Sequence, residues 1–331
     1  LSPSPEVAGR LARVLSVRPE DLFGHSGVAV HFLQYRKRST FRKRAERHLK
    51  GLVQTALEQR VRVQEIVAPG ERPLLPRRYR VRNEEDAERA ADDLRRLWNL
   101  GTAPVANLTA ALEQRLIHVV AVDMPESFDG ISALVQRESG GEIVAVAVVS
   151  RRVESGERWR MNLAHELAHL VLEPVGGLDE EKAAFRFAGA FLAPASSLCE
   201  VVGPFRARIT AEELMNLRSY YGMSMQALLY RMRVLGIVTE EYARQWWRFF
   251  TRQGWRKKEP GESAPEQSVW MKHNLLRACG EMLLTPEEAR ALLPPGETLE
   301  LTGPVPRTQE PGGPAGDGPA QPGRLAEPER V

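Results

Sequence analysis

Three residues carry the clearest chemical signal in the sequence. His165, Glu166 and His169 form the pattern His-Glu-x-x-His inside a mostly apolar run. Residues four apart lie one turn apart on the same face of a helix, so both imidazoles would point the same way. Two imidazoles at that separation can share one zinc ion, and the glutamate can reach a water molecule at the metal without binding the metal itself. The pattern predicts a zinc-dependent hydrolase with Glu166 as the general base.

An amphipathic helix with a solvated His-Glu edge is the alternative explanation of this motif. Two features favour the metal site. The flanking residues are apolar, which indicates a buried helix, and unpaired histidine and glutamate side chains are costly to bury. A third metal ligand is also available a short distance downstream.

That third ligand is expected in the first turn of the next helix. A Gly-Gly pair marks a turn after the motif, and Asp179 is suited to cap a helix that follows it. The turn would fold the second helix back against the first. Glu181 shares a face with apolar residues of this helix, which makes it the best ligand candidate. Glu180 and Asp179 stay open as alternatives, since either could instead be a solvated residue at the start of the helix.

Together, these two segments resemble the ImmA/IrrE family of bacterial metallopeptidases. Residues 160–169 are RMNLAHELAH and residues 181–194 are EKAAFRFAGAFLAP. The family pattern is close to RFTLAHELGH, followed by E-x-E-A-N-x-F-A-x-x-L-L-x-P. The resemblance extends over residues 87–250. It implies that His165, His169 and Glu181 bind zinc and that Glu166 is the general base.

The departures of the chain from the family pattern are modest, and none of them removes a ligand or the base. Asn162 replaces a threonine and Ala168 replaces a glycine. Ala183 stands at the second glutamate of the pattern, so Glu181 is the remaining carboxylate. Phe185 stands where an asparagine is common. A further segment, residues 128–132 (FDGIS), matches a common F-D-G-x-S stretch of the family.

The resemblance also implies a function. Such proteins are regulatory endopeptidases whose substrate is typically an XRE-type transcriptional repressor, cleaved under stress or on induction of a mobile element. One alternative is a DNA-binding transcriptional regulator whose zincin-like domain is a sensor or interaction module. Another is a closed structural zinc site, against which Glu166 argues because such a site needs no base.

Peptide hydrolysis at a zinc ion also needs a group that stabilises the oxyanion formed from the scissile carbonyl. The sequence offers five residues for this role and does not choose between them: Tyr220, Tyr221, Tyr230, Arg186 and Arg231.

Composition narrows the class of protein further. The chain has 331 residues, a formal net charge of +3 and two cysteines, Cys199 and Cys279, neither in a CxxC pair. The metal site must therefore consist of histidine and glutamate. No apolar run is long enough to span a membrane and no signal-peptide pattern is present, so we expect a cytoplasmic protein with reduced thiols and no membrane partner.

The first part of the chain contains a partial helix-turn-helix pattern and a basic segment. Residues 1–24 resemble the last two helices of an XRE-type helix-turn-helix domain. The recognition helix of that fold would lie upstream, so we expect that the sequence is N-terminally incomplete or that its start was assigned too late. Residues 25–80 are predicted to be a basic helical linker, with one long helix over residues 31–67 or two helices with a break near Ser39. Within this linker a phosphate backbone could be contacted by Arg36, Lys37, Arg38, Arg42 and Lys43. A solvated linker helix is the favoured interpretation, and DNA binding would need the full-length N-terminal region.

The remaining segments predict an α+β fold, a mainly helical zincin-like domain with a small sheet. This domain should span residues 83–255, with an edge strand that aligns the substrate backbone. His118 should lie on the surface of the first strand. Residues 256–293 should form a polar linker and a helical hairpin, and residues 294–331 a disordered Pro/Gly-rich tail. The strands of the sheet are predicted at residues 117–122, 132–137 and 143–149, and the helices before it at residues 84–97 and 104–114.

Overall fold

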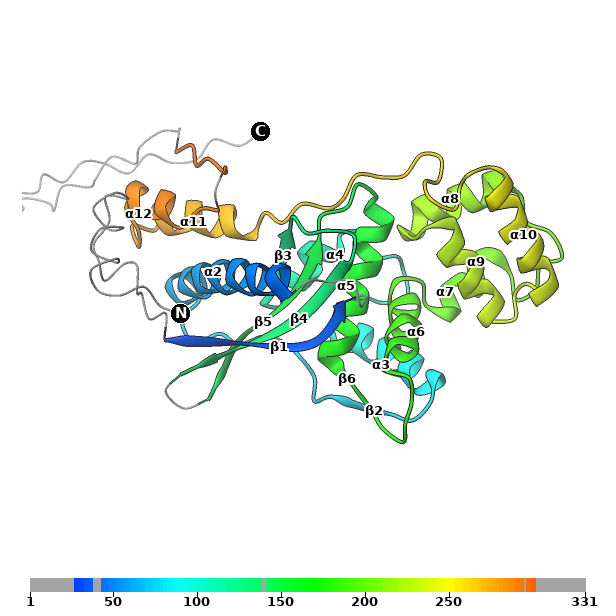
Figure 1. Ribbon diagram of the computed structural model, residues 1–331, viewed down its shortest axis with the longest axis horizontal. Helices are drawn as coiled ribbons and strands as arrows, with labels where there is room; N and C mark the ends of the chain where they lie inside the picture. The colour runs from blue at the N-terminus through cyan, green and yellow to red at the C-terminus, as the bar shows by residue number, and fades with distance from the viewer. Residues whose placement is uncertain (1–26, 38–42, 139–140, 295, 302–331) are drawn as a thin grey trace, which may run out of the picture. The chain divides into compact units, whose positions relative to one another are not determined.

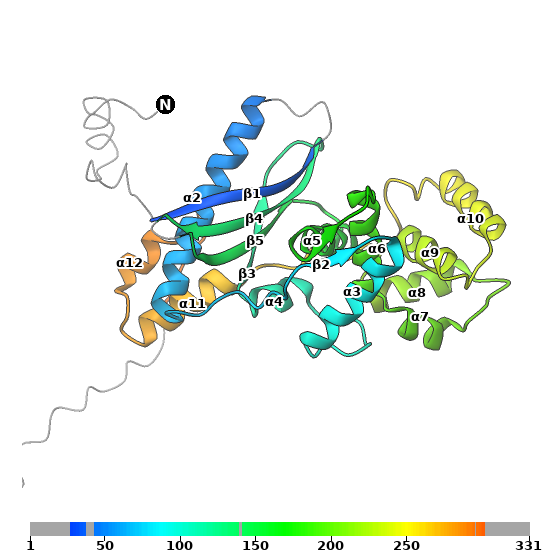
Figure 2. The ribbon, with the colours of Figure 1, turned by 90° about the horizontal axis from the view of Figure 1, so that it is seen from below.

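In a computed structural model of the protein, the described residues are 27–37, 43–138, 141–294 and 296–301. They form a mixed four-stranded sheet, with α-helices packed against both of its faces, and a small two-stranded sheet (Figures 1 and 2). The α+β class expected from the sequence is confirmed.

The main sheet has the strand order β1-β4-β5-β3. Strands β4 (Phe128–Arg137) and β5 (Ile143–Arg151) are antiparallel neighbours, and β3 (Ile117–Val122) runs parallel to β5. Strand β1 (Val28–Lys37) lies antiparallel to β4 at the edge. Residues 144–149 of β5 are apolar and buried without alternation, because the central part of the sheet is covered on both faces.

The prediction of a helix over residues 31–67 is wrong for residues 31–37, which belong to β1. Helix α2 occupies only Lys43–Val67. Val28, Val30 and Phe32 are β-branched or aromatic and fit a pleated, half-buried surface. Their pairing partners in β4 lie about a hundred residues later in the chain, as Val30 with Val135 shows. Local sequence patterns cannot reveal such a distant partner.

Helix α2 is part of the main core and is not a separate linker. Its buried residues Leu49, Val53, Leu57 and Val61 pack against one face of the sheet. Its C-terminal half packs against α11 (Trp270–Gly280), which forms a hairpin with α12 (Pro286–Ala291) (Figure 1). Contacts thus join the segment predicted as a linker to both the sheet and the C-terminal hairpin.

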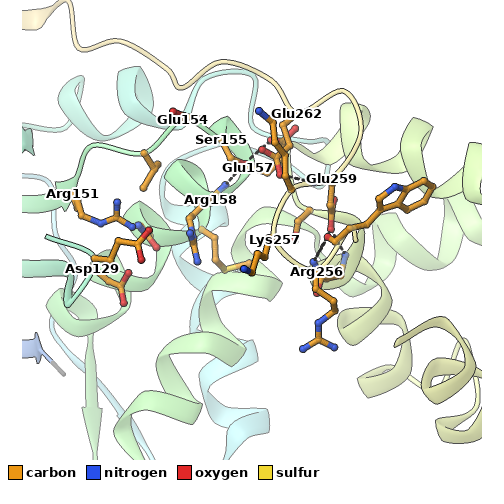
Figure 3. A pocket seen from close by; sticks show the side chains of 18 of the residues that line it. Asp129, Arg151, Glu154, Ser155, Glu157, Arg158, Arg256, Lys257, Glu259 and Glu262 are labelled. Atoms are coloured by element: carbon orange, nitrogen blue, oxygen red, sulfur yellow. Dashed lines mark hydrogen bonds between the residues drawn. The ribbon is translucent and has the colours of Figure 1, made fainter. Parts of the chain in front are cut away.

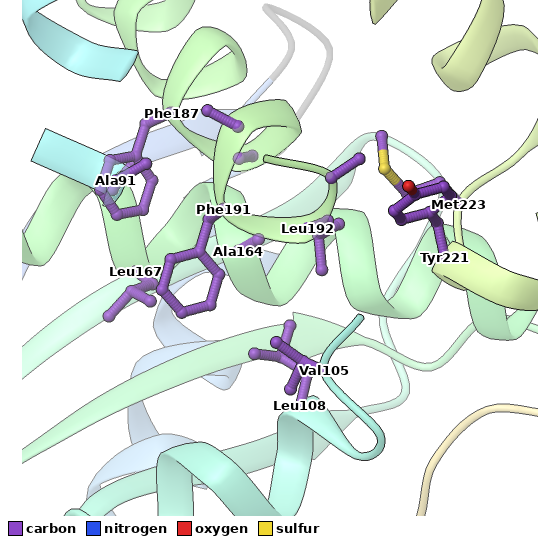
Figure 4. Close-up of a cluster of buried hydrophobic side chains, with 14 of the residues drawn as sticks. Ala91, Val105, Leu108, Ala164, Leu167, Phe187, Phe191, Leu192, Tyr221 and Met223 are labelled. Atoms are coloured by element: carbon purple, nitrogen blue, oxygen red, sulfur yellow. The ribbon is translucent and has the colours of Figure 1, made fainter. Parts of the chain in front are cut away.

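The other face of the sheet carries the helix with the His-Glu-x-x-His motif. Helix α5 (Gly156–Val171) lies between the sheet and α6 (Glu180–Leu192), and α6 packs in turn against α3 (Glu84–Leu97). Figure 4 shows the core that these helices share with α4 (Leu108–Glu113), with Leu167 of α5 near the rings of Phe187 and Phe191. Strands β2 (Tyr79–Val81) and β6 (Leu172–Pro174) pair beside it.

Four further helices follow the site: α7 (Ala195–Val202), α8 (Ala211–Tyr221), α9 (Met225–Val234) and α10 (Glu240–Arg252). The side chains of Thr210, Ser224 and Thr239 cap the last three, each accepting a backbone N–H. Glu213 pairs with Arg206. The aromatic residues at the end of α10, among them Trp246 and Phe250, pack edge-on or tilted against one another.

Residues 256–268, which we call the strap, join α10 to α11 (Figure 1). The strap is polar, as predicted, but it is held at the N-termini of three helices. The Glu259 carboxylate accepts from Met225 N at 2.7 Å, where α9 begins. The Ser263 carbonyl accepts from Gly156 N at 2.8 Å, where α5 begins. Glu266 accepts from Leu108 N and Thr109 N, where α4 begins. Each contact satisfies N–H groups that have no partner inside their helix.

His118 is fully buried, so the expectation of a surface position is wrong. Its Nε2 lies 3.0 Å from Gln64 Oε1 on α2, and its ring packs at 4.7 Å against that of Trp270. Burial, together with the nearby Arg60, lowers the pKa of His118. The sequence pattern of β3 gave no sign that α2 and α11 cover this face.

Several predictions concern residues outside the described part of the chain. These are the helix-turn-helix remnant at residues 1–24, the basic residues Arg38 and Arg42, and the tail beyond residue 301. The side chains of Arg36 and Lys37 are also outside it, whereas Lys43 is exposed at the start of α2. No single helix in the described ranges has the length and apolar character to cross a membrane, although the bent pair α6–α7 meets that test jointly.

Candidate metal centre

Helix α5 places the two histidines and the glutamate in the interior. It begins at Gly156, where the Ser155 side chain accepts from Arg158 N, and its sequence is apolar enough to be buried on almost every side. His165 is fully buried and Glu166 is 1% exposed, while His169 is 7% exposed near the end of the helix. The helix therefore holds both imidazoles in a low-dielectric setting with one open end.

The turn after α5 brings a carboxylate back to these histidines. Gly176 and Gly177 have positive φ angles of 71° and 80°, which a glycine pair adopts without strain. Asp179 then caps α6 by accepting from the N–H groups of Glu181 and Lys182 at 3.1 Å each. This capping role matches the sequence-based expectation. The Asp179 carboxylate is therefore hydrogen-bonded to the backbone of its own helix.

His165, His169 and Glu181 meet at one point. The two Nε2 atoms lie 3.1 Å apart, and the Glu181 oxygens lie 3.3 Å from His165 Nε2 and 3.5 Å from His169 Nε2. Tetrahedral zinc with bonds of about 2.0–2.1 Å holds its ligand atoms about 3.3 Å apart. The triangle therefore fits a metal of that size. Within the part of the chain that the structure describes, neither Asp179 nor Glu180 belongs to this cluster.

Glu181 supplies a negative charge to the cluster. Hydrogen bonding to His165 and then to His169 holds the pKa of the Glu181 carboxyl well below its usual range, although the side chain is half-exposed. Glu181 therefore stays ionised at neutral pH. An ionised carboxylate and neutral imidazoles are the protonation states that metal binding requires.

Glu166 lies against strand β4. The Ser132 hydroxyl is 3.0 Å from Glu166 Oε2 and 2.7 Å from the Glu166 carbonyl oxygen. A Cβ atom at Gly130 would approach Glu166 Oε1 to 2.5 Å and its Cδ to 2.9 Å, so only glycine leaves room for this carboxylate. The sequence-based prediction of the site did not include Ser132 or Gly130. The FDGIS stretch was their only signal, and it showed no link to the base.

Phe185, at the position where the family pattern has asparagine, packs on a metal-ligand candidate. Its ring centroid lies 4.4 Å from that of His165 with an interplanar angle of 55°. Phe185 is 41% exposed, so one side of the ring also faces the cavity beside the cluster. The ring thus limits the orientation of His165 and contributes an apolar surface to the site.

The residues proposed to stabilise the oxyanion lie elsewhere. Arg186 and Arg231 both pair with Glu88 of α3, at 2.5 and 2.6 Å. The Tyr221 hydroxyl is 3.0 Å from Ser197 Oγ and is buried. Tyr220 and Tyr230 are about half exposed, and neither lines the two cavities at the cluster. The Arg186–Glu88–Arg231 group instead joins α3, α6 and α9 behind the site.

Two cavities flank the cluster along α5. The larger, about 870 Å³, is lined by Asn162 and Phe185 near the histidines and extends to the strap (Figure 3). The smaller, about 410 Å³, is lined by His169, Leu33 of β1 and Arg78. Arg78 donates to the backbone carbonyls of His169 and Leu172 at the end of α5. An extended chain could therefore pass the metal position with space on both sides.

A buried pair of histidines, a carboxylate from the following helix and a glutamate held beside them define a metallopeptidase-like domain. More specifically, residues 141–233 match the IrrE N-terminal-like domain, peptidase family M78. The match runs from just before β5 to the end of α9 and contains all four site residues. It confirms the ImmA/IrrE resemblance for this part of the chain and implies use of a metal ion. No curated protein matches the chain.

Proposed function

We propose that the protein is a regulatory zinc-dependent endopeptidase that hydrolyses a peptide bond in a protein substrate. The observation that carries this proposal is the triangle of His165, His169 and Glu181, with edges of 3.1–3.5 Å, beside the buried Glu166. Zinc is favoured over other metals because two imidazoles and one carboxylate in a small triangle suit its tetrahedral geometry.

The reaction follows from the placement of the side chains. When bound, zinc would act as a Lewis acid that lowers the pKa of a water molecule and polarises the scissile carbonyl. Glu166 would accept the proton of that water and pass it to the leaving amine. Ser132 holds the Glu166 carboxylate by its hydroxyl, and Phe185 packs on His165, so both groups are oriented before substrate arrives.

Access to the cluster supports a catalytic site over a closed structural one. Glu181 is 46% exposed, and a cavity adjoins the cluster on each side. A structural zinc ion has four protein ligands, whereas a catalytic one keeps a position for water or substrate. Among the described residues the cluster provides three ligands, which matches the catalytic arrangement.

An XRE-type transcriptional repressor is the proposed substrate, and this part of the proposal rests on the family resemblance alone. The alternative function is a DNA-binding transcriptional regulator whose zincin-like domain is a sensor or interaction module. That function depends on residues 1–24 and on the basic residues near the start of α2, of which Lys43 is described and exposed.

The test combines metal analysis with cleavage. Wild type, Glu166→Gln, Glu181→Gln and the control Glu180→Gln are purified, their zinc content is measured, and each is incubated with a co-encoded XRE-type repressor. We expect one zinc per chain in all but Glu181→Gln, and cleavage only by wild type and Glu180→Gln. Cleavage that persists in Glu166→Gln would refute the proposed role of Glu166. A metal-free wild type that binds duplex DNA would favour the regulator.

A further inference from the structure

The cavity between the metal cluster and the strap has a cationic wall. We propose that this wall, formed by Arg158, Arg256, Lys257 and Lys258, binds acidic side chains of the substrate, so that the enzyme selects segments rich in Asp and Glu near the cleaved bond. This inference rests on the proposed peptidase function and specifies its substrate class. All four residues line the cavity that reaches Asn162 and Phe185 beside the metal ligands (Figure 3).

The carboxylates nearest to the strap already have partners. Glu259 accepts from Met225 N and Gln226 N, and Glu262 accepts from Glu259 N at 2.9 Å. Glu157 accepts from Ser263 N and lies 3.7 Å from the Arg218 guanidinium. These three carboxylates face backbone amides or a buried arginine, so they hold the strap in place instead of neutralising its exposed cations.

The four cations of the wall have no such partners. They are exposed, and no carboxylate of the described residues lies within ion-pair distance of any of them. Arg256 instead lies over the Trp247 ring, 5.6 Å from its centroid. At the opposite end of the cavity Asp129 lies beside Arg151, so cationic and acidic side chains are mixed there (Figure 3). Acidic and basic residues are equal in number over the whole lining, which also includes Glu126 and Glu154, and the four cations without an ion-pair partner among the described residues lie at the strap end.

The wall is also fixed relative to the metal cluster. Ser263 binds Gly156 N at the start of α5, and α5 carries both histidines. A Cβ atom at Gly156 would come within 2.5 Å of the Ala264 carbonyl oxygen, which shows how closely the strap lies against this helix. Arg158 is itself a residue of α5. Helix α5 and the closely packed strap thus set the distance between the backbone positions of the cations and the scissile bond.

Fixed cations that lack partners gain most from a carboxylate that arrives with the substrate. Complementary charges of this kind raise the association rate and discriminate against basic segments. Each exposed ion pair contributes modestly, so selectivity would come from several cations acting together. A substrate segment with two or more carboxylates within a few residues of the cleaved bond fits this wall best.

The test is cleavage profiling of a peptide library by mass spectrometry, with the zinc-loaded full-length enzyme and with Glu166→Gln as the inactive reference. We expect Asp and Glu to be enriched at fixed positions on one side of the cleaved bond. For the best peptide, replacing one of those acidic residues by its amide should lower kcat/KM about two- to five-fold. Added salt should reduce the preference.

Charge-reversal variants then assign the preference to the wall. Lys257→Glu combined with Arg158→Glu should lower kcat/KM for the acidic peptide about ten-fold or more and raise it for a matched lysine peptide. Lys272→Glu on α11 makes the same kind of charge change on an exposed residue outside both cavities and should leave the profile unchanged.

The outcomes separate the two proposals. Zinc-loaded wild type that cleaves peptides with no enrichment of acidic residues, or a double variant with an unaltered profile, would overturn the cationic wall and leave the peptidase function standing. A wild type whose products equal those of Glu166→Gln would remove the peptidase function and the substrate class with it. Enrichment that the double variant loses and the Lys272→Glu control retains would establish the inference.

Discussion

At the scale of single residues, the general-base candidate is positioned by a strand as well as by its own helix. Gly130 gives the Glu166 carboxylate room, and the Ser132 hydroxyl binds it. Both contacts come from β4, which precedes the motif by about thirty residues. The catalytic geometry therefore depends on the register of β4 against its neighbours, in which Gly130 faces Ser150 and Ser132 faces Val148.

Substitution of Gly130 should lower catalytic activity without a change in stability. In Gly130→Ala the new methyl group would come within 2.9 Å of three side-chain atoms of the buried Glu166, so the glutamate side chain has to move. General-base catalysis contributes about 10²–10⁴-fold, and we expect kcat to fall by about 10²-fold with unchanged zinc content and melting temperature. Steady-state kinetics and elemental analysis check this. Full activity in Gly130→Ala would mean that the carboxylate needs no such space.

The residues predicted from the sequence are those with local signals. The spacing of His165 and His169, the turn before α6 and the cap at Asp179 are all visible within a few positions, and the structure brings Glu181 to both histidines. Gly130 and Ser132 were missed because their partner is remote in sequence. His118 was misplaced for the same reason, since the helices that bury it are distant parts of the chain.

At the scale of helices, the site depends on a buried ion group that joins three of them. Glu88 of α3 pairs with Arg186 of α6 and Arg231 of α9, and Arg231 Nε also donates to the Ala193 carbonyl at the end of α6. Helix α6 carries Glu181 and Phe185. The group therefore fixes the helix that carries the candidate for the third metal ligand.

Stability should depend on pH through Glu88. Burial raises the pKa of Glu88, but the hydrogen bonds and positive charges of Arg231 and Arg186 lower it by more than burial raises it. The pKa of Glu88 therefore lies below its ordinary value of 4.5. A carboxyl whose pKa is lower in the folded state stabilises the fold above its unfolded-state pKa and loses that contribution as pH falls. We expect Glu88→Gln to cost about 3 kcal/mol at pH 7.

Urea unfolding of metal-free wild type and Glu88→Gln over a pH series measures this contribution. The difference in unfolding free energy between the two proteins should be largest near neutral pH. It should shrink as the pH falls below about 4.5, because Glu88 then takes up a proton in the unfolded chain before it does so in the folded protein. Glu281→Gln, which removes an exposed pair with Arg277, serves as the control and should show little effect. A difference that stays constant down to acid pH would contradict the assigned pKa direction.

At the scale of the whole described fold, the segments outside the family match complete the domain. Strand β1 extends the sheet, α2 covers one face, and the strap satisfies the N-termini of α4, α5 and α9. The sequence boundaries drawn at residues 83 and 255 followed changes in composition. Composition reports local preference, whereas the strand pairing and the three strap contacts are long-range.

Glu266 of the strap should contribute more to the free energy of unfolding than is expected for a residue of a polar linker. Glu266 pairs with the buried Arg160 at 2.5 Å and accepts two backbone N–H groups of α4. Glu266→Gln would leave Arg160 buried without its carboxylate, and we expect a loss of about 3 kcal/mol in unfolding free energy. Denaturant unfolding checks this, with Gln267→Ala, at the neighbouring exposed position, as the control. Equal stability of the two variants would show that the strap is only a connector.

The strap also bears on the order in which the chain can fold during its synthesis. Ser263 N binds the Glu157 carboxylate across 106 residues of sequence, and the Ser263 carbonyl serves the first amide of α5. A ribosome that has just made the histidines has not yet made these partners. A nascent chain would therefore carry both histidines well before the helix that bears them is fastened, and the proposed metal centre would be held in place only after the strap has left the ribosome.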